Sequence, residues 1–91
     1  MMTVRVVVRG RVQGVGYRAW TEAEASARRL NGWVRNRRDG TVEAVLAGDD
    51  AKVGDMLHVM RQGPPAAAVT ALDVSAWIER VGRSFEMRPT E

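Results

Sequence analysis

The segment from Gly10 to Arg18 reads Gly-Arg-Val-Gln-Gly-Val-Gly-Tyr-Arg and carries the residue types of an anion site. Gly14 and Gly16 allow backbone torsions that residues with a Cβ avoid, so successive N–H groups can turn toward one point. Arg18, in the first turn of a helix that starts here, can donate two hydrogen bonds to one phosphate. The spacing predicts a phosphate-binding loop with its own cation. Its N–H donors would belong to the turn formed by the two glycines and to the helix N-terminus that follows.

This glycine pattern is short, and short glycine patterns occur in many unrelated proteins. No Gly-Lys-Ser/Thr follows it, as in a Walker A motif, and the full Gly-x-Gly-x-x-Gly of dinucleotide-binding folds is absent. A tight connection between a strand and a helix, with a surface arginine, fits the spacing equally well. The spacing alone therefore leaves both interpretations open.

The composition is that of one globular domain that covers residues 1–91. Hydrophobic residues make up 45% of the chain and charged residues 27%, which is usual for a soluble protein. The chain has no cysteine, which excludes disulfides, thiolate nucleophiles and cysteine metal sites. No apolar run approaches the length of a membrane span, since Arg5 and Arg9 interrupt the valine-rich start. We expect a cytoplasmic protein without membrane contact.

The net charge is small and positive. Lysine and arginine number 14 against 11 acidic residues, which gives a formal charge of +3. Such an excess fits a solvated surface, or attraction of a small anionic substrate, better than it fits a nucleic-acid surface. We expect no nucleic-acid partner and a monomer.

The first half of the chain predicts a strand, a helix and a second strand. Residues 3–9 alternate valine with arginine, as a strand with one face on a core does. A helix is expected from about Tyr17 to Leu30, with the stop signal Asn31-Gly32 behind it. The helix face expected to be buried consists of Trp20, Ala23, Ala27 and Leu30. Residues 33–37 then predict the second strand.

The middle of the chain predicts a hairpin and a second helix. Asp39-Gly40 is a two-residue hairpin signal, and residues 41–47 read as the third strand. Gly48-Asp49-Asp50 predicts a turn and a helix N-cap. Gly63-Pro64-Pro65 ends the helix that follows. The apolar positions of that helix have the spacing of a core-facing surface: Val53, Met56, Leu57 and Met60.

The last third predicts one long strand and one short one. Residues 69–78 alternate, with Leu72, Val74 and Ala76 expected to face inward. Residues 84–88 predict a short final strand before a frayed tail, 89–91. The order β-α-β-β-α-β predicts an α+β, ferredoxin-like two-layer sandwich with both helices on one face of an antiparallel sheet and a short extra strand.

This topology brings Asn36 toward the glycine loop. The first two strands belong to one right-handed crossover unit and run parallel, so their C-terminal ends lie at the same edge of the sheet. The loop leaves the first strand there, and Asn36 lies near the end of the second, on the same face as Val34. We expect the Asn36 amide to point toward the loop and Arg18. An asparagine that satisfies its own backbone before a turn is the plainer alternative.

Two stretches together resemble the signatures of the acylphosphatase family: Gly10–Arg18 and the sequence Gly-Trp-Val-Arg-Asn at 32–36. Residues 39–43 and the Gly-Pro-Pro at 63–65 continue the resemblance, which covers essentially the whole chain. Tyr17 stands where phenylalanine is the commoner family residue, and this change keeps the aromatic ring.

The resemblance implies a metal-independent hydrolase that needs no cofactor and splits acyl phosphates, which are carboxylic–phosphoric mixed anhydrides, into a carboxylate and inorganic phosphate. It assigns phosphate binding to Arg18 and to the backbone N–H groups of the loop: Gln13, Gly14, Val15, Gly16, Tyr17 and Arg18. It assigns orientation of the attacking water to Asn36.

Other interpretations use other residues. An acylphosphatase-like module without turnover would bind an anion or RNA, with Trp33 and Trp77 on the open face of the sheet as a stacking platform. A patch covered by the C-terminal segment is the plainer account of these tryptophans. The chain could also be a domain cut from a larger carbamoyl-transfer maturation protein, although we expect it to be free-standing. His58, on the second helix, is expected to be structural or exposed, and Asp49-Asp50 a helix cap rather than a metal site.

Overall fold

The computed structural model describes residues 1–91. Its elements follow in the order β1 (Met2–Arg11), α1 (Tyr17–Ala27), β2 (Asn31–Asn36), β3 (Val42–Gly48), α2 (Asp50–Gln62), β4 (Ala68–Ala76) and β5 (Phe85–Met87). The predicted β-α-β-β-α-β order, with a short fifth strand, is confirmed. No helix is long and apolar enough to cross a membrane.

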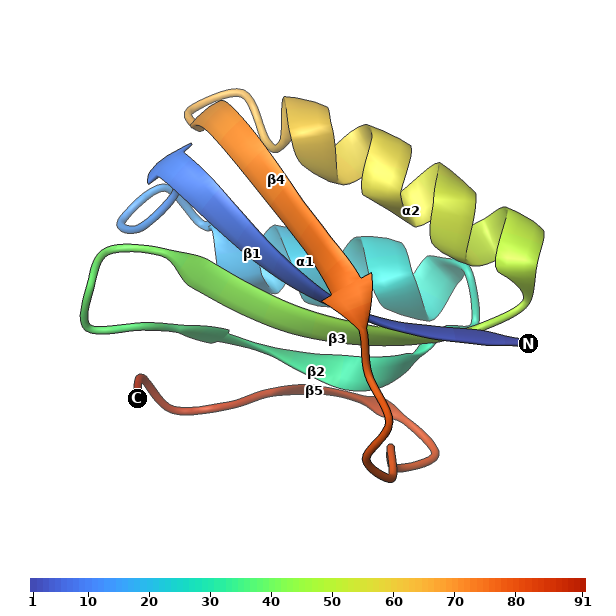
Figure 1. Ribbon diagram of the computed structural model, residues 1–91. Coiled ribbons are helices and arrows are strands. Elements are labelled where there is room, and N and C mark those ends of the chain that lie inside the picture. The colour runs from blue at the N-terminus through green and yellow to red at the C-terminus, as the bar shows by residue number, and fades with distance from the viewer.

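The sheet has five strands in the order β4-β1-β3-β2-β5. Both β1 and β2 pair antiparallel with β3, so they run parallel to each other, as the crossover predicts. Both helices cover the same face of the sheet (Figure 1). This is the ferredoxin-like sandwich, and it places the C-terminal ends of β1 and β2 at one edge.

The core lies between the helices and the sheet, because each element presents one apolar face to that layer. From β1 it takes Val4, Val6 and Val8, which alternate with arginine and with Val7 on the opposite face. The other core residues with an exposed fraction of 1% or less are Val12, Tyr17, Ala25, Val34, Val42, Ala44, Leu46, Val53, Met56 and Met60.

The buried face of α1 differs from the prediction. The side chains that point into the core are Tyr17, Thr21 and Ala25, while Ala23 and Ala27 are exposed and Trp20 is half-buried. The predicted face followed the apolar residues, but alanine is too small to decide which face is buried. The real face carries two side chains with hydroxyl groups.

Helix α1 also ends earlier than predicted, at Ala27. Arg29 has φ 56°, a left-handed conformation that stops the helix. Leu30 N–H returns to the Ala25 carbonyl at 3.0 Å, which turns Leu30 into the core. The expected stop, Asn31-Gly32, is therefore the start of β2, which begins two residues before the predicted strand.

The hairpin between β2 and β3 has a three-residue loop rather than the predicted two-residue one. Arg37 N–H donates to the Thr41 carbonyl at 2.8 Å, so residues 38–40 form the loop. Gly40 closes it with φ 93°, as expected of a loop whose last residue is left-handed. Strand β3 runs from Val42 to Gly48, one residue later than predicted.

Strand β4 lies at the edge of the sheet, and its apolar residues are therefore less buried than predicted. Leu72 is buried as predicted, but Val74 is 43% exposed and Ala76 is also exposed. An edge strand has a neighbour on one side only, so its end is less well covered. The strand ends at Ala76, and Ile78, which the prediction included, lies fully in solvent.

Helix α2 agrees well with its prediction. Asp49 is the N-cap, and its carboxylate accepts from the Lys52 N–H at 3.3 Å. Val53, Met56 and Met60 are buried, while Leu57 is half-buried at the edge of the core. His58 is exposed, in agreement with a surface role.

The C-terminal segment packs against β2, so the prediction of a frayed tail at residues 89–91 is wrong. Strand β5 pairs parallel with β2, and the chain continues beside β2 after β5 ends. Arg88 N–H donates to the Val34 carbonyl at 2.8 Å and Glu91 N–H to the Asn36 carbonyl at 3.1 Å. The last residues therefore lie alongside the strand that carries Asn36 (Figure 1).

Candidate active site

The loop between β1 and α1 depends on two glycines with left-handed torsions. Gly14 has φ 73° and Gly16 has φ 79°. A Cβ at either position would meet no atom within 4 Å, so the requirement for glycine comes from the torsion and not from lack of space. Gly16 is the N-cap of α1 and provides no side chain to cap the helix.

This loop leaves a series of N–H groups unpaired. No N–H from Gln13 to Gly16 donates to a protein oxygen, and the first hydrogen bond of α1 runs from Trp20 N–H to the Gly16 carbonyl at 3.0 Å. The N–H groups of 17–19, in the first turn, have no partner within the helix either. Unpaired donors and the positive end of a helix together make an anion-binding surface.

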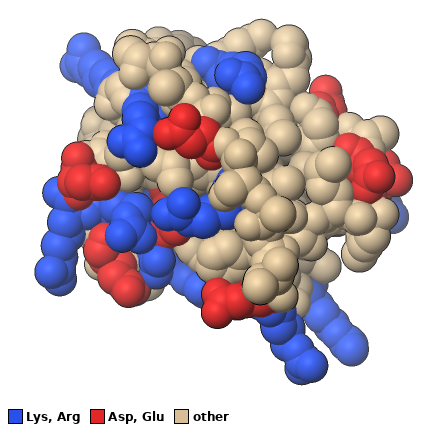
Figure 2. Space-filling view, in the orientation of Figure 1, with Lys and Arg blue, Asp and Glu red and all other residues tan.

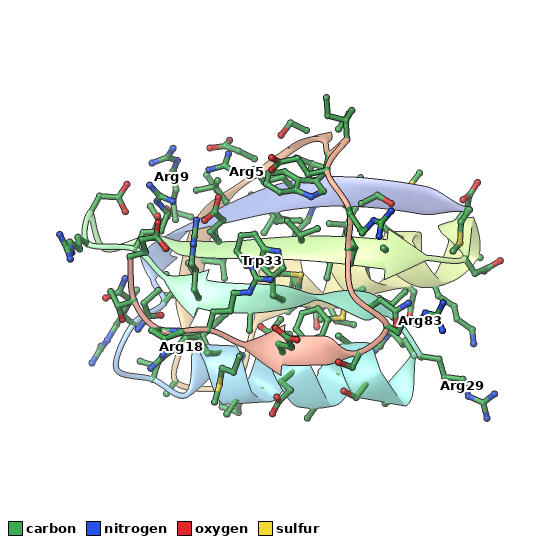
Figure 3. All side chains as sticks on the ribbon, turned by 90° about the horizontal axis from the view of Figure 1, so that it is seen from below. Arg5, Arg9, Arg18, Arg29, Trp33 and Arg83 are labelled. Atoms are coloured by element: carbon green, nitrogen blue, oxygen red, sulfur yellow. The ribbon has the colours of Figure 1, made fainter.

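Arg18 and Asn36 come together over this loop, as predicted. Both line the same pocket, which has a volume of about 180 Å³. The structure contains one pocket. Figure 3 shows Arg18 at the start of α1, at the same end of the molecule as the end of β2. The lining residues are Val12, Gly14, Gly16, Tyr17, Arg18, Ala19, Asn36 and Met87.

Neither polar side chain of the pocket is bound within the protein. The Arg18 guanidinium has no carboxylate partner and donates to no protein oxygen, and the Asn36 amide forms no side-chain hydrogen bond. The side chain of Asn36 lies on the helix-covered face with Val34, and does not satisfy its own backbone. The pocket thus holds a free cation, a free amide and free N–H groups.

Gln13 and Val15, two of the predicted loop residues, do not line the pocket. The Gln13 side chain turns away and donates from Nε2 to the Arg37 carbonyl at 2.7 Å and to the Thr41 carbonyl at 2.8 Å. Val15 packs against the core. Their backbone N–H groups stay unpaired, so a role for these groups in anion binding remains a prediction.

Tyr17 anchors the loop to α2. Its ring is buried, its hydroxyl donates to the Met60 carbonyl at 2.7 Å, and burial raises the pKa of that hydroxyl. Met60 would normally accept from the N–H of residue 64, but that residue is Pro64 and has none. The tyrosine therefore satisfies a carbonyl that the helix cannot.

On the opposite face of the sheet, three other arginines donate hydrogen bonds to one carboxylate. Glu43 is 3% exposed and accepts from Arg5 at 2.6 Å, Arg35 at 2.7 Å and Arg37 at 3.0 Å. Burial acts to raise the pKa of Glu43, but these hydrogen bonds outweigh it and lower the pKa. Arg18, like Arg11 and Arg38 on neighbouring segments, has no carboxylate partner, and it is the arginine that lines the pocket.

The tryptophans do not form an open stacking platform. Trp33 is only 5% exposed on the helix-free face of the sheet, where Trp77 packs edge-on at 6.0 Å between ring centroids (Figure 3). The guanidinium groups of Arg35 and Arg88 each lie 4.7 Å from the Trp33 ring centroid. This is the covered patch expected as the plainer account of these tryptophans.

Three lining residues were not predicted: Val12 and Ala19, which flank the predicted loop residues, and Met87. Met87 comes from β5, at the far end of the chain from the glycine loop. Its alternation with Phe85 would have placed both side chains on the helix-covered face. Nothing in the sequence, however, indicated that β5 pairs with β2 and so reaches Asn36.

The comparisons with known proteins agree with this architecture. The family model described as Acylphosphatase matches residues 4–87. A curated acylphosphatase of Bradyrhizobium diazoefficiens is 47% identical over 96% of this chain and 94% of its own length. The crystal structure of acylphosphatase from Bacillus subtilis superposes with a TM-score of 0.91 at 36% identity, over 97% of this chain and 99% of that one. Full-length HypF, in a phosphate- and nucleotide-bound form, shares the fold alone: its TM-score is 0.87 at 19% identity, over 99% of this chain and 12% of that chain.

Proposed function

Because the chain belongs to the acylphosphatase family and hydrolyses acyl phosphates, we propose that Arg18 and the glycine loop hold the phosphoryl group and that Asn36 orients the attacking water. The observation that carries this proposal is the meeting of three unpaired groups in one pocket: loop N–H donors, a guanidinium and a carboxamide.

The reaction demands little of the protein. The leaving group of an acyl phosphate is a carboxylate, which departs without being protonated. The protein must therefore hold the phosphoryl group, stabilise the charge on its equatorial oxygens and align a water opposite the leaving oxygen. None of these tasks needs a strong base or a covalent intermediate.

Arg18 and the loop perform the first two tasks. The N–H groups of 13–19 point at the phosphoryl oxygens, and the guanidinium forks onto two of them. Since Arg18 has no carboxylate to give up, no ion pair has to be broken when the substrate binds. The backbone N–H donors are held in place by the loop and the helix before binding, which is the condition for strong electrostatic stabilisation of a transition state.

Asn36 performs the third task. Its amide oxygen accepts a hydrogen bond from the water, and the water oxygen then faces phosphorus on the side away from the leaving carboxylate. An amide cannot take up the proton of that water at neutral pH, so its contribution is geometric. The metaphosphate-like character of such transition states makes a weak, well-aligned nucleophile sufficient.

The positive charge of Arg18 and the helix N-terminus takes the place that a metal ion has in many phosphoryl-transfer sites. We therefore propose that the reaction is independent of metals and cofactors. Basic and acidic side chains are interspersed on the face seen in Figure 2, which supports the proposal that no nucleic acid binds. That the protein is a single domain, a monomer and cytoplasmic stays a prediction.

The test is the hydrolysis of benzoyl phosphate in excess chelator. The loss of ultraviolet absorbance by benzoyl phosphate measures the rate. Arg18→Ala should lower kcat/KM by about 10²–10³-fold, the range for removing one oxyanion donor. The matched control is Arg83→Ala, which should keep wild-type activity. Arg83 is exposed and lies at the opposite end of the sheet from Arg18 (Figure 3).

Two results would contradict the proposal. Wild-type turnover that disappears in chelator and returns with added metal would refute metal independence. An Arg18→Ala variant as active as Arg83→Ala would remove Arg18 from the phosphate site.

A further inference from the structure

The pocket has a polar end and an apolar rim. The polar end consists of the loop N–H groups, Arg18 and Asn36. Of the apolar lining residues, Val12 and Tyr17 are each 1% exposed and present little surface to a ligand. Ala19 is small. Met87, at 47% exposure, is the one large apolar side chain of the pocket with a free surface.

Met87 is not needed by the core. Phe85, two residues earlier on the same face of β5, is buried and belongs to the core cluster. Met87 is neither part of that cluster nor among the half-buried apolar side chains that pack against it. A half-exposed methionine that lines a pocket and stabilises no core has a free surface to offer a ligand.

The register of the sheet fixes where Met87 lies relative to the polar groups. Met87 pairs with Val34 in the parallel β2–β5 ladder, so both side chains point to the helix-covered face. Asn36 follows Val34 by two residues on that same face. Met87 therefore stands beside the Asn36 side of the pocket, on the edge that opens away from β3.

The pocket is smaller than the sites that enclose drug-sized ligands. Its volume is about 180 Å³, below the roughly 300–1,000 Å³ of sites that bury drug-sized ligands. With the phosphoryl group and the adjoining carbonyl at the polar end, a bulky acyl group has to extend across the rim.

We propose that Met87 is the rim contact of the acyl group and makes the enzyme favour substrates with aromatic or bulky apolar acyl groups. This inference rests on the proposed phosphate site. The flexible, polarizable thioether adapts to irregular apolar surfaces and makes favourable contacts with aromatic ring edges. A small acyl group, such as acetyl, does not reach the side chain and gains nothing from it.

The test compares benzoyl phosphate with acetyl phosphate in wild type, Met87→Ala, Met87→Leu and Ile78→Ala. Met87→Ala should lower kcat/KM for benzoyl phosphate about fivefold, mostly through KM, and change that for acetyl phosphate less than twofold. Met87→Leu, which keeps an apolar side chain of similar size, should restore most of the preference. Ile78→Ala, which trims an exposed side chain outside the pocket, should match wild type.

Inhibition by inorganic phosphate separates the two proposals. It should be equal in wild type and Met87→Ala, because the phosphate end is unchanged. Equal losses on both substrates, or no loss on either, with normal phosphate inhibition would overturn the role of Met87 and leave the phosphate site intact. A wild-type protein that hydrolyses neither substrate would overturn both.

Discussion

The side chain of Gln13 and the backbone of Arg37 are joined by a hydrogen bond of 2.7 Å, from Nε2 to the carbonyl oxygen. A second bond from the same nitrogen reaches the Thr41 carbonyl at 2.8 Å. Gln13 belongs to the glycine loop, and Arg37 directly follows Asn36. The two bonds therefore fix the distance between the loop proposed to hold phosphate and the residue proposed to hold water.

Replacing Gln13 by alanine should lower kcat about tenfold. Both bonds are lost, at about 0.5–1.5 kcal/mol each, and the water is then misaligned against the bound phosphoryl group. Steady-state kinetics with benzoyl phosphate measures the effect. Gln62→Ala, at the exposed end of α2, is the control and should be unaffected. A Gln13→Ala variant with wild-type kcat would show that the β2–β3 turn holds Asn36 without this support.

Asn36→Ala should lower kcat about 10²-fold or more, comparable to the loss of a preorganised polar group, and leave the phosphate site intact. Competitive inhibition by inorganic phosphate checks the second half of this statement. The free energy of unfolding should hardly change, because the amide makes no hydrogen bond within the protein. A variant that loses phosphate affinity and turnover in parallel would place Asn36 in binding instead of in water orientation.

Tyr17→Phe should destabilise the protein by about 1–3 kcal/mol, the range for leaving a buried acceptor unpaired. The unpaired group would be the Met60 carbonyl, which Pro64 cannot serve. Urea denaturation measures the change. The kcat of the folded variant should stay within about twofold of wild type, because the hydroxyl points to α2 and away from the loop N–H groups. An unchanged urea midpoint would mean that the carbonyl has another partner.

Glu43→Gln should make folding stability less dependent on pH in acid. The pKa of Glu43 is lower in the folded protein than its ordinary value of 4.5, so its contribution is complete above pH 4.5 and is lost as the pH falls through the folded pKa. At pH 7 the variant should be less stable by about 1.5–3 kcal/mol, the range for hydrogen bonds to charged groups. Below pH 4.5 the difference should shrink. Glu79→Gln, in an exposed loop, is the control, and a difference that stays constant with pH would refute this role of Glu43.

Local sequence patterns predicted the elements that carry the site. The alternating valines of β1, the glycines at 14 and 16 and the cap at Asp49 each act through neighbouring residues, and the structure has them as expected. The parallel crossover then brought Asn36 to the pocket that Arg18 lines.

What the sequence could not predict depends on contacts between distant segments. Gln13 looked like one more loop residue, because its acceptors lie on a hairpin 24 and 28 residues away. Met87 and the docked tail depend on the parallel pairing of β5 with β2, which no local pattern encodes. The prediction of the buried face of α1 was wrong because it did not count Thr21 and Tyr17, which carry hydroxyl groups, as core residues.

The torsions at Gly14 and Gly16 also limit which sequences could serve this site. Because space around both positions is open, a side chain is disfavoured there by backbone handedness alone. Asparagine and aspartate tolerate left-handed torsions best among residues with a side chain. Aspartate would bring a negative charge next to a bound phosphoryl group. Asparagine is therefore the substitution expected to strain the loop least at either glycine.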